Sequence, residues 1–160
     1  MNTYLISLAD LKEIALINNN VEDSILRVTL QRVQRYRIKP VITAPLYDRL
    51  IEGIENEDLN TDEIKLIEEY IAPFIAVECD RKAINHTTYQ IRNKTTGKGT
   101  DENITAVNES ENLRLDNDVR SDIFSAEQEL IDFLRENAAK YPQYKCPVKR
   151  KTTVNNISFI

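Results

Sequence analysis

The stretch TDEIKLIEEYIAPFIAV, residues 61–77, decides the fold class. Four apolar residues within it recur every three or four positions: Ile64, Ile67, Ile71 and Phe74. This spacing predicts a helix with one apolar face. Thr61 can cap the first turn, and the helix should continue towards Tyr89. Pro73 lies inside the pattern and should kink the helix, because proline removes a backbone donor.

Two helices are expected before residue 40. Ser7 and Asp10 have the spacing of a capping box, so a short helix should run over residues 8–14. A second helix is predicted over residues 22–37, where apolar residues again recur at helical spacing. It should end at Lys39-Pro40, because the residue before a proline disfavours helical backbone angles.

Two further helices complete the predicted bundle. Thr43 can cap a helix that carries Pro45 in its first turn. A last helix is predicted over residues 117–140 and should stop at Tyr141-Pro142. The sequence therefore predicts a mainly α fold, a compact bundle of about four to five helices.

Two segments do not fit the helical pattern. Residues 91–115 are mostly polar and contain Gly97 and Gly99, which predicts a protruding loop or a short β-hairpin. The stretch after Pro142 is basic and polar, and we expect an extended tail that becomes ordered where a partner receives it. The expected organisation is a helical domain over residues 1–142, including the protruding loop 92–115, followed by a tail over residues 143–160.

Composition narrows the class of protein. A chain of 160 residues suits one domain, and only 3 glycines favour helices over a turn-rich sheet fold. No apolar run is long enough to span a membrane and no secretory signal is evident, so we expect a soluble protein without a membrane partner. Cys79 and Cys146 lie in dissimilar contexts, and two free thiols are favoured over a disulfide.

Charge is unevenly distributed along the chain. Acidic residues crowd the stretch 52–69, whereas basic residues crowd residues 27–39 and the tail from Lys145 to Lys151. Solvated helix faces explain any one of these stretches. The alternative is that the acidic edge of one copy meets the basic edge of the next, a head-to-tail contact that forms a ring when the rotation closes. The net charge of −5 argues against a surface that is wholly a nucleic-acid footprint.

The usual catalytic and metal-binding patterns are missing, so we expect no enzyme activity, no cofactor and no metal. His86 is the only histidine, and it lies among Asn and Thr residues without a partner for acid–base chemistry. Zinc ligation is not expected from one histidine and two distant cysteines. The segment 97–100, GKGT, fails as a phosphate loop because Arg92 stands where the first glycine is required.

The order of elements and two short motifs carry a family resemblance. The motifs are PLYDRL at residues 45–50 and NAAKYP at residues 137–142. Over residues 7–144 the chain resembles the small helical head–tail connector proteins (head completion or adaptor proteins) of tailed bacteriophages. The version it resembles is that of crAss-like and other phages of Bacteroidetes hosts. The glycine usual before the Leu-Tyr pair is absent, and Ala44 and Pro45 stand there.

This resemblance implies a structural virion protein located at the neck, between head and tail, and assembled in the cytoplasm of the host bacterium. Its partners would be copies of itself in a ring, typically a dodecamer, the portal protein, and further neck or tail proteins. DNA would pass through the lumen without sequence-specific binding. The resemblance places the protein-interface residues in the loop and the tail: Arg92, Lys94, Lys98, Lys149, Arg150, Lys151, Val154, Ile157 and Phe159.

Two other functions stay open at this point. The amphipathic helices also suit a small helical regulator that binds a protein partner. Arg92, Lys94 and Lys98 could instead touch a phosphate backbone and make the chain a weak nucleic-acid-binding module, although a solvated loop is favoured. Salt-sensitive DNA binding that is lost when these three residues are neutralised would favour the latter.

Overall fold

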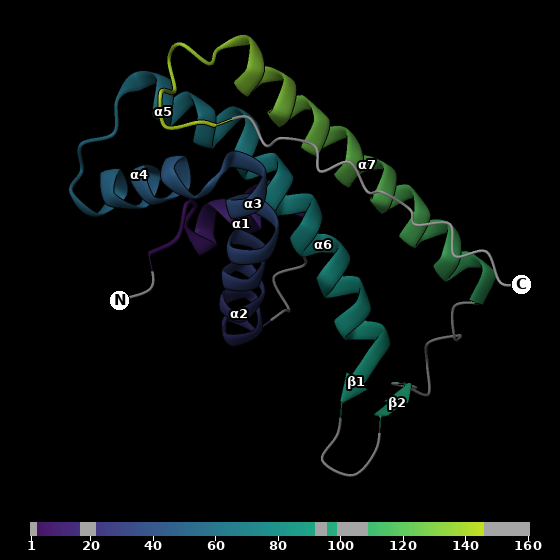
Figure 1. Ribbon diagram of the computed structural model, residues 1–160. Coiled ribbons are helices and arrows are strands. Elements are labelled where there is room, and N and C mark those ends of the chain that lie inside the picture. Colours follow the sequence, from purple (N-terminus) through teal and green to yellow (C-terminus); the bar gives the residue numbers. More distant parts are fainter. Residues whose placement is uncertain (1–2, 17–21, 92–95, 99–108, 146–160) are drawn as a thin grey trace, which may run out of the picture.

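The computed structural model describes residues 3–16, 22–91, 96–98 and 109–145, and for residues 83–91, 96–98, 109–113 and 115 it describes the backbone alone. Helices make up most of this part of the chain (Figure 1). The predicted mainly α fold is confirmed, and a two-stranded antiparallel hairpin accompanies the helices.

The first helix, α1, spans Leu8–Ile14 and has the predicted capping box. The backbone N–H of Asp10 donates to Ser7 Oγ at 3.1 Å, and the backbone N–H of Ser7 donates to Asp10 Oδ2 at 3.4 Å. These reciprocal bonds satisfy two of the donors that a helix start leaves unpaired. The cap therefore fixes where the N-terminal segment turns into α1.

The second helical segment passes through Pro40 instead of ending there. It consists of α2 (Asp23–Val33), a π-helical turn (Gln34–Ile38) and α3 (Lys39–Ile42). The backbone N–H of Lys39 bonds to the carbonyl of Gln34, five residues back. A proline ring in a regular α-helix collides with the carbonyl four residues earlier. The wider π turn accommodates the ring, so the predicted end at Lys39-Pro40 is wrong.

The fourth helix, α4, spans Ala44–Glu55 with Pro45 in its first turn, as predicted. The predicted capping role of Thr43 is wrong, because its side chain makes no capping hydrogen bond. Thr43 has φ 72° and ψ 150°, a backbone conformation that glycine adopts most readily. It turns the chain sharply from α3 into α4.

The long helical segment predicted from residues 61–77 consists of α5 (Thr61–Leu66), a π-helical turn (Ile67–Ile71) and α6 (Ala72–Thr88). Its cap is Asn60 and not Thr61, because Asn60 Oδ1 accepts the backbone N–H of Glu63 at 2.9 Å. The N–H of Ala72 bonds to the carbonyl of Ile67, so a π turn again directly precedes a proline, Pro73. The segment stays helical beyond Pro73, as expected.

The hairpin and the last helix follow α6. Strands β1 (Tyr89–Ile91) and β2 (Thr96–Lys98) pair with Tyr89 opposite Lys98. The last helix, α7, spans Glu109–Glu136, so it begins eight residues earlier and ends four residues earlier than predicted. Part of the predicted loop 92–115 is therefore helical, and residues 92–95 and 99–108 lie outside the described residues.

The core lies where α6 and α7 pack on α1 to α4. The largest side chains with almost no exposed surface come from six of these helices and from the turn after α7, among them Leu11, Leu30, Ile42, Leu50, Phe74, Leu134 and Tyr141. Tyr144 is also buried, so the body extends two residues past the predicted boundary at 142. The tail beyond Lys145 lies outside the described residues.

Candidate functional site

Most of the predicted interface residues fall outside the described residues. They are Arg92, Lys94, Lys149, Arg150, Lys151, Val154, Ile157 and Phe159. Lys98 is described, and it lies on β2 with its backbone opposite Tyr89. Gly97 lies on the same strand, within the hairpin that extends from the end of α6 (Figure 1).

The acidic stretch 52–69 is partly neutralised within the body. Arg49 on α4 lies 2.9 Å from Glu63 and 2.8 Å from Asp58. Hydrogen bonds to Asp58 and Glu63 raise the pKa of Arg49 above its ordinary value. Lys140, after α7, lies 2.8 Å from Asp62. Several of the carboxylates that suggested an acidic edge therefore hold α4, α5 and the end of α7 together.

Part of the basic stretch 27–39 is likewise neutralised by ion pairs within the body. Arg37 joins three helical segments, because it binds Glu78 on α6 and lies 3.1 Å from Glu127 on α7. Burial alone would lower the pKa of Arg37, but the hydrogen bond and charge of Glu78, together with Glu127, leave it raised. Lys39 pairs with Asp48 at 2.7 Å. Arg37 and Lys39 therefore form ion pairs within the fold and are less available to bind a partner.

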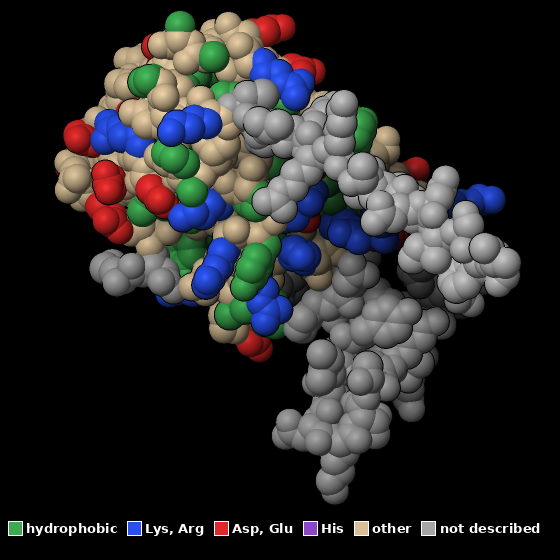
Figure 2. Space-filling model, in the orientation of Figure 1, with side chains coloured by type: hydrophobic (Ala, Val, Ile, Leu, Met, Phe, Trp, Pro, Cys, Tyr) green, Lys and Arg blue, Asp and Glu red, His purple; other side chains and the backbone are tan. Residues whose placement is uncertain are grey.

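Some charges remain exposed on the surface. Arg27, Arg32 and Arg35 lie along and just after α2, and none of the described carboxylates is within ion-pair distance of them. Figure 2 shows Lys and Arg side chains over α2, and Asp and Glu side chains at the far end of α4. The basic and acidic surfaces predicted from sequence are thus present in reduced form.

The described residues hold no evident reactive centre. Cys79 is fully buried, and burial raises the pKa of its thiol to about 12, so it stays protonated and unreactive near neutral pH. No group of three metal-ligating side chains comes together within the part of the chain that the structure describes. The backbone of His86 lies in α6, and its side chain is among those not described.

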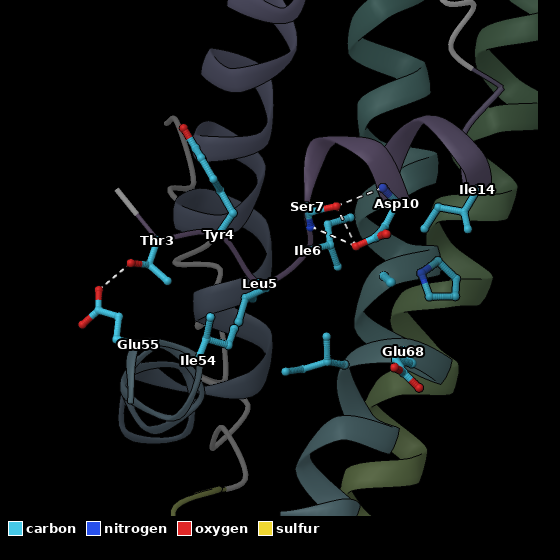
Figure 3. Close-up of a pocket in the computed structure, with 13 residues that line it drawn as sticks. Thr3, Tyr4, Leu5, Ile6, Ser7, Asp10, Ile14, Ile54, Glu55 and Glu68 are labelled. Carbon is cyan, nitrogen blue, oxygen red and sulfur yellow. Dashed lines mark hydrogen bonds between the residues drawn. The ribbon is translucent and has the colours of Figure 1, made fainter. Parts of the chain in front are cut away.

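A groove of about 990 Å³ lies on the described surface. One wall is the N-terminal segment with α1, from Thr3 to Ile14, and the opposite wall is formed by the end of α4 and the turn between α5 and α6. Figure 3 shows residues 3–7 crossing between α4, which carries Ile54 and Glu55, and α1, which carries Asp10 and Ile14. Its volume lies at the upper end of roughly 300–1,000 Å³, the range of ligand sites.

The groove has an apolar floor and an acidic rim. Its apolar lining residues are Leu5, Ile6, Ile14, Ile54, Ile67, Ala72 and Pro73. Its charged lining residues are Asp10, Glu55 and Glu68, and no Lys or Arg is among them. Asp10 belongs to the cap of α1 and Glu55 bonds to the Thr3 hydroxyl, whereas Glu68 is exposed and pairs with none of the described cations. The groove therefore suits a ligand that is apolar and positively charged.

Sequence patterns did not reveal this groove. Its walls are about 40 to 70 residues apart in the chain, and each contributes only short apolar runs that also fit core packing. Ile14 gives the one local signal, because it stays 49 % exposed although it lies on the amphipathic α1. An exposed large aliphatic residue is common on protein surfaces and is not diagnostic by itself.

A protein-family model described as a family of unknown function, DUF6712, matches residues 38–154. The chain belongs to this family. The match to DUF6712 includes α3 to α7, the hairpin and part of the tail, and residues 3–14 of the groove precede it. No curated protein and no solved structure matches the chain. No described helix is both long and apolar enough to cross a membrane.

Proposed function

We propose that the chain is a structural virion protein, a head–tail connector that forms a ring between the portal and the tail or neck proteins of a tailed bacteriophage. The observation that carries the proposal is the β1–β2 hairpin, which extends from the end of α6 away from α1 to α4 (Figure 1). A hairpin held away from its own body presents its strand edges to other chains. The sequence resemblance to connector proteins points to the same role.

The surface charges support self-association. Exposed arginines lie on α2 and exposed carboxylates lie at the far end of α4 (Figure 2). If these two surfaces meet between neighbouring copies, the contact is heterologous, and such a contact closes into a ring at the right rotation. The partners of the ring would be the portal protein above and further neck or tail proteins below, with DNA passing through the lumen.

Deletion of residues 146–160 in the virus that encodes the chain tests this role. The deletion begins after Tyr144, which is buried and belongs to the body. We expect filled heads and free tails that fail to join, counted by electron microscopy. The matched control is Glu129→Gln, at an exposed acid on α7 outside the groove and away from the acidic end of α4, which should join normally. Normal joining by the deletion variant, with the chain absent from purified particles, would contradict the proposal.

The exposed arginines on α2 favour a second candidate, weak nucleic-acid binding. Exposed guanidinium groups that pair with no described carboxylate can neutralise phosphates, and such binding weakens steeply with added salt. Replacing Arg27, Arg32 and Arg35 by Gln should then abolish salt-sensitive DNA binding in a fluorescence anisotropy titration. A chain that binds no DNA at low salt is not a nucleic-acid-binding module.

A further inference from the structure

The acid-rimmed groove lacks a partner within the described chain. Its floor residues Leu5, Ile6, Ile67 and Ala72 are less than 8 % exposed, so the groove is a formed hollow and not a gap between loose side chains. Ile14 and Glu68 stay exposed at its rim. An occupant would gain by burying aliphatic groups on the floor and by placing positive charge at the rim.

The chain itself contains one segment with both properties. Residues 146–160, CPVKRKTTVNNISFI, carry three consecutive cations at positions 149–151. Apolar residues follow them and are Val154, Ile157, Phe159 and Ile160. The segment contains no Asp or Glu. Its charge and its apolar content therefore complement the rim and the floor of the groove.

The end of the described chain lies close to the groove wall. The Tyr141 hydroxyl donates to the Asp62 carbonyl oxygen at 2.8 Å, which holds the chain beside the start of α5. Ile67 and Glu68 of the groove follow Asp62 on the same helical segment, at about 1.5 Å of rise per residue. Phe133 stacks on Tyr70, so α7 lies on another face of that segment.

The tail is long enough to pass around the helix. A helix with its side chains is roughly 10–12 Å across. The 15 residues after Lys145 span up to roughly 50 Å when extended. The apolar end of the tail can therefore reach the groove wall, and Lys149, Arg150 and Lys151 can lie up to roughly 13–20 Å of extended chain from Lys145.

We propose that residues 146–160 of the same chain dock in the groove formed by residues 3–14, 54–55 and 67–73, with Lys149, Arg150 and Lys151 beside the acidic rim and the apolar end on the floor. A tethered segment has an effective concentration in the millimolar range for its own groove, which favours it over the tail of a second copy in dilute solution. The inference goes beyond the proposed function and does not depend on it. It concerns the isolated chain.

Limited proteolysis of the full chain tests the docking directly. Trypsin cuts after Lys149, Arg150 and Lys151 when they are accessible, and mass spectrometry quantifies each product. The reference is a synthetic peptide of residues 145–160 under the same conditions. We expect cleavage of the tail in the chain to be at least roughly tenfold slower than in the peptide, because a docked segment is cut only while it is undocked. Added salt should reduce this protection.

Matched variants locate the docking site. Ile14→Ser and Glu68→Gln should each speed tail cleavage roughly two- to fivefold, since each removes one contact of the groove. Val28→Ser is the control for Ile14, because both residues are 49 % exposed and Val28 lies on α2 outside the groove. Glu52→Gln is the control for Glu68, and both controls should leave the rate unchanged.

Three outcomes would overturn the proposal. The first is cleavage of the natural chain at the rate of the free peptide. The second is an equal effect of groove variants and controls. The third is protection that disappears when the protein is diluted about a hundredfold, because an intramolecular contact is independent of concentration. None of these outcomes bears on ring formation or on joining of heads to tails, so the two proposals fail separately.

Discussion

Arg37 binds carboxylates on two other helices, Glu78 on α6 and Glu127 on α7. Its partner Glu78 has a side chain only 2 % exposed. We expect Arg37→Met to lower the free energy of unfolding by about 2 kcal/mol, because Glu78 is left buried without its donor. Urea denaturation measures the loss. The control Arg35→Met removes an exposed arginine that pairs with no described carboxylate, and it should change stability by less than about 0.5 kcal/mol. Equal effects would contradict the assigned role of Arg37.

Tyr141 makes stability sensitive to alkaline pH. Burial, followed by the nearby Asp62 carboxylate, raises the pKa of Tyr141 from 10.0 to about 12. The unfolded chain therefore loses this proton first, and the contribution of Tyr141 to stability is lost as pH rises from about 10 to about 12. Tyr141→Phe should cost about 1 kcal/mol at pH 7 through its lost hydrogen bond to the Asp62 carbonyl.

Between pH 10 and pH 12, the free energy of unfolding of Tyr141→Phe should fall less than that of the natural chain. Urea denaturation at a series of pH values makes the comparison. Tyr36→Phe is the control, because Tyr36 is 65 % exposed, and it should keep the full alkaline loss. An alkaline loss that Tyr141→Phe leaves unchanged would show that another group causes it.

The end of α4 offers a test at the scale of a single element. Glu57 has φ 56°, a left-handed conformation, and the N–H of Asp58 bonds to the Gly53 carbonyl at 3.0 Å. This position after a helix usually holds glycine. Glu57→Gly should raise the free energy of unfolding by about 0.5–1 kcal/mol, because it removes the strain of a side chain at positive φ.

The neighbouring position supplies the control for this change. Asn56 has φ −95°, which any residue adopts, so Asn56→Gly should gain nothing and lose a few tenths of a kcal/mol through added freedom in the unfolded chain. Thermal unfolding of both variants makes the comparison. A gain at both positions, or at neither, would contradict the assignment of strain to Glu57.

Local sequence rules predicted helices well where a contact between residues close in the chain decides the structure. The capping box at Ser7 and the apolar spacing of Ile64, Ile67, Ile71 and Phe74 both gave helices at the expected places. The rules failed where they expect a proline to end a helix, because the backbone can change its hydrogen-bond pattern and continue past the proline. Pro40 lies inside a continuous helical segment because a π turn precedes it, and no side-chain pattern indicates such a turn.

The groove was not predictable for a different reason. It depends on the packing of α1 against α4 and the α5–α6 turn, and the residues on each wall carry the same apolar pattern as core residues. Charge predictions failed in part for a similar reason. Only the folded chain shows that Glu63 pairs with Arg49 and that Arg37 pairs with Glu78.

The whole molecule combines a helical body, a hairpin at one end and exposed charges of both signs. These features are suited to assembly with other copies and with neighbouring proteins. We propose on this basis that the chain forms a closed ring.

Mass photometry of the purified full chain, alone and mixed with the portal protein of the same virus, tests that claim most directly. We predict one discrete species with the mass of a closed ring, expected to be a dodecamer of the 18.5 kDa chain, at least when the portal is present. Electron microscopy of that species should show a central lumen. A chain that stays monomeric, with and without the portal, would contradict the proposed function.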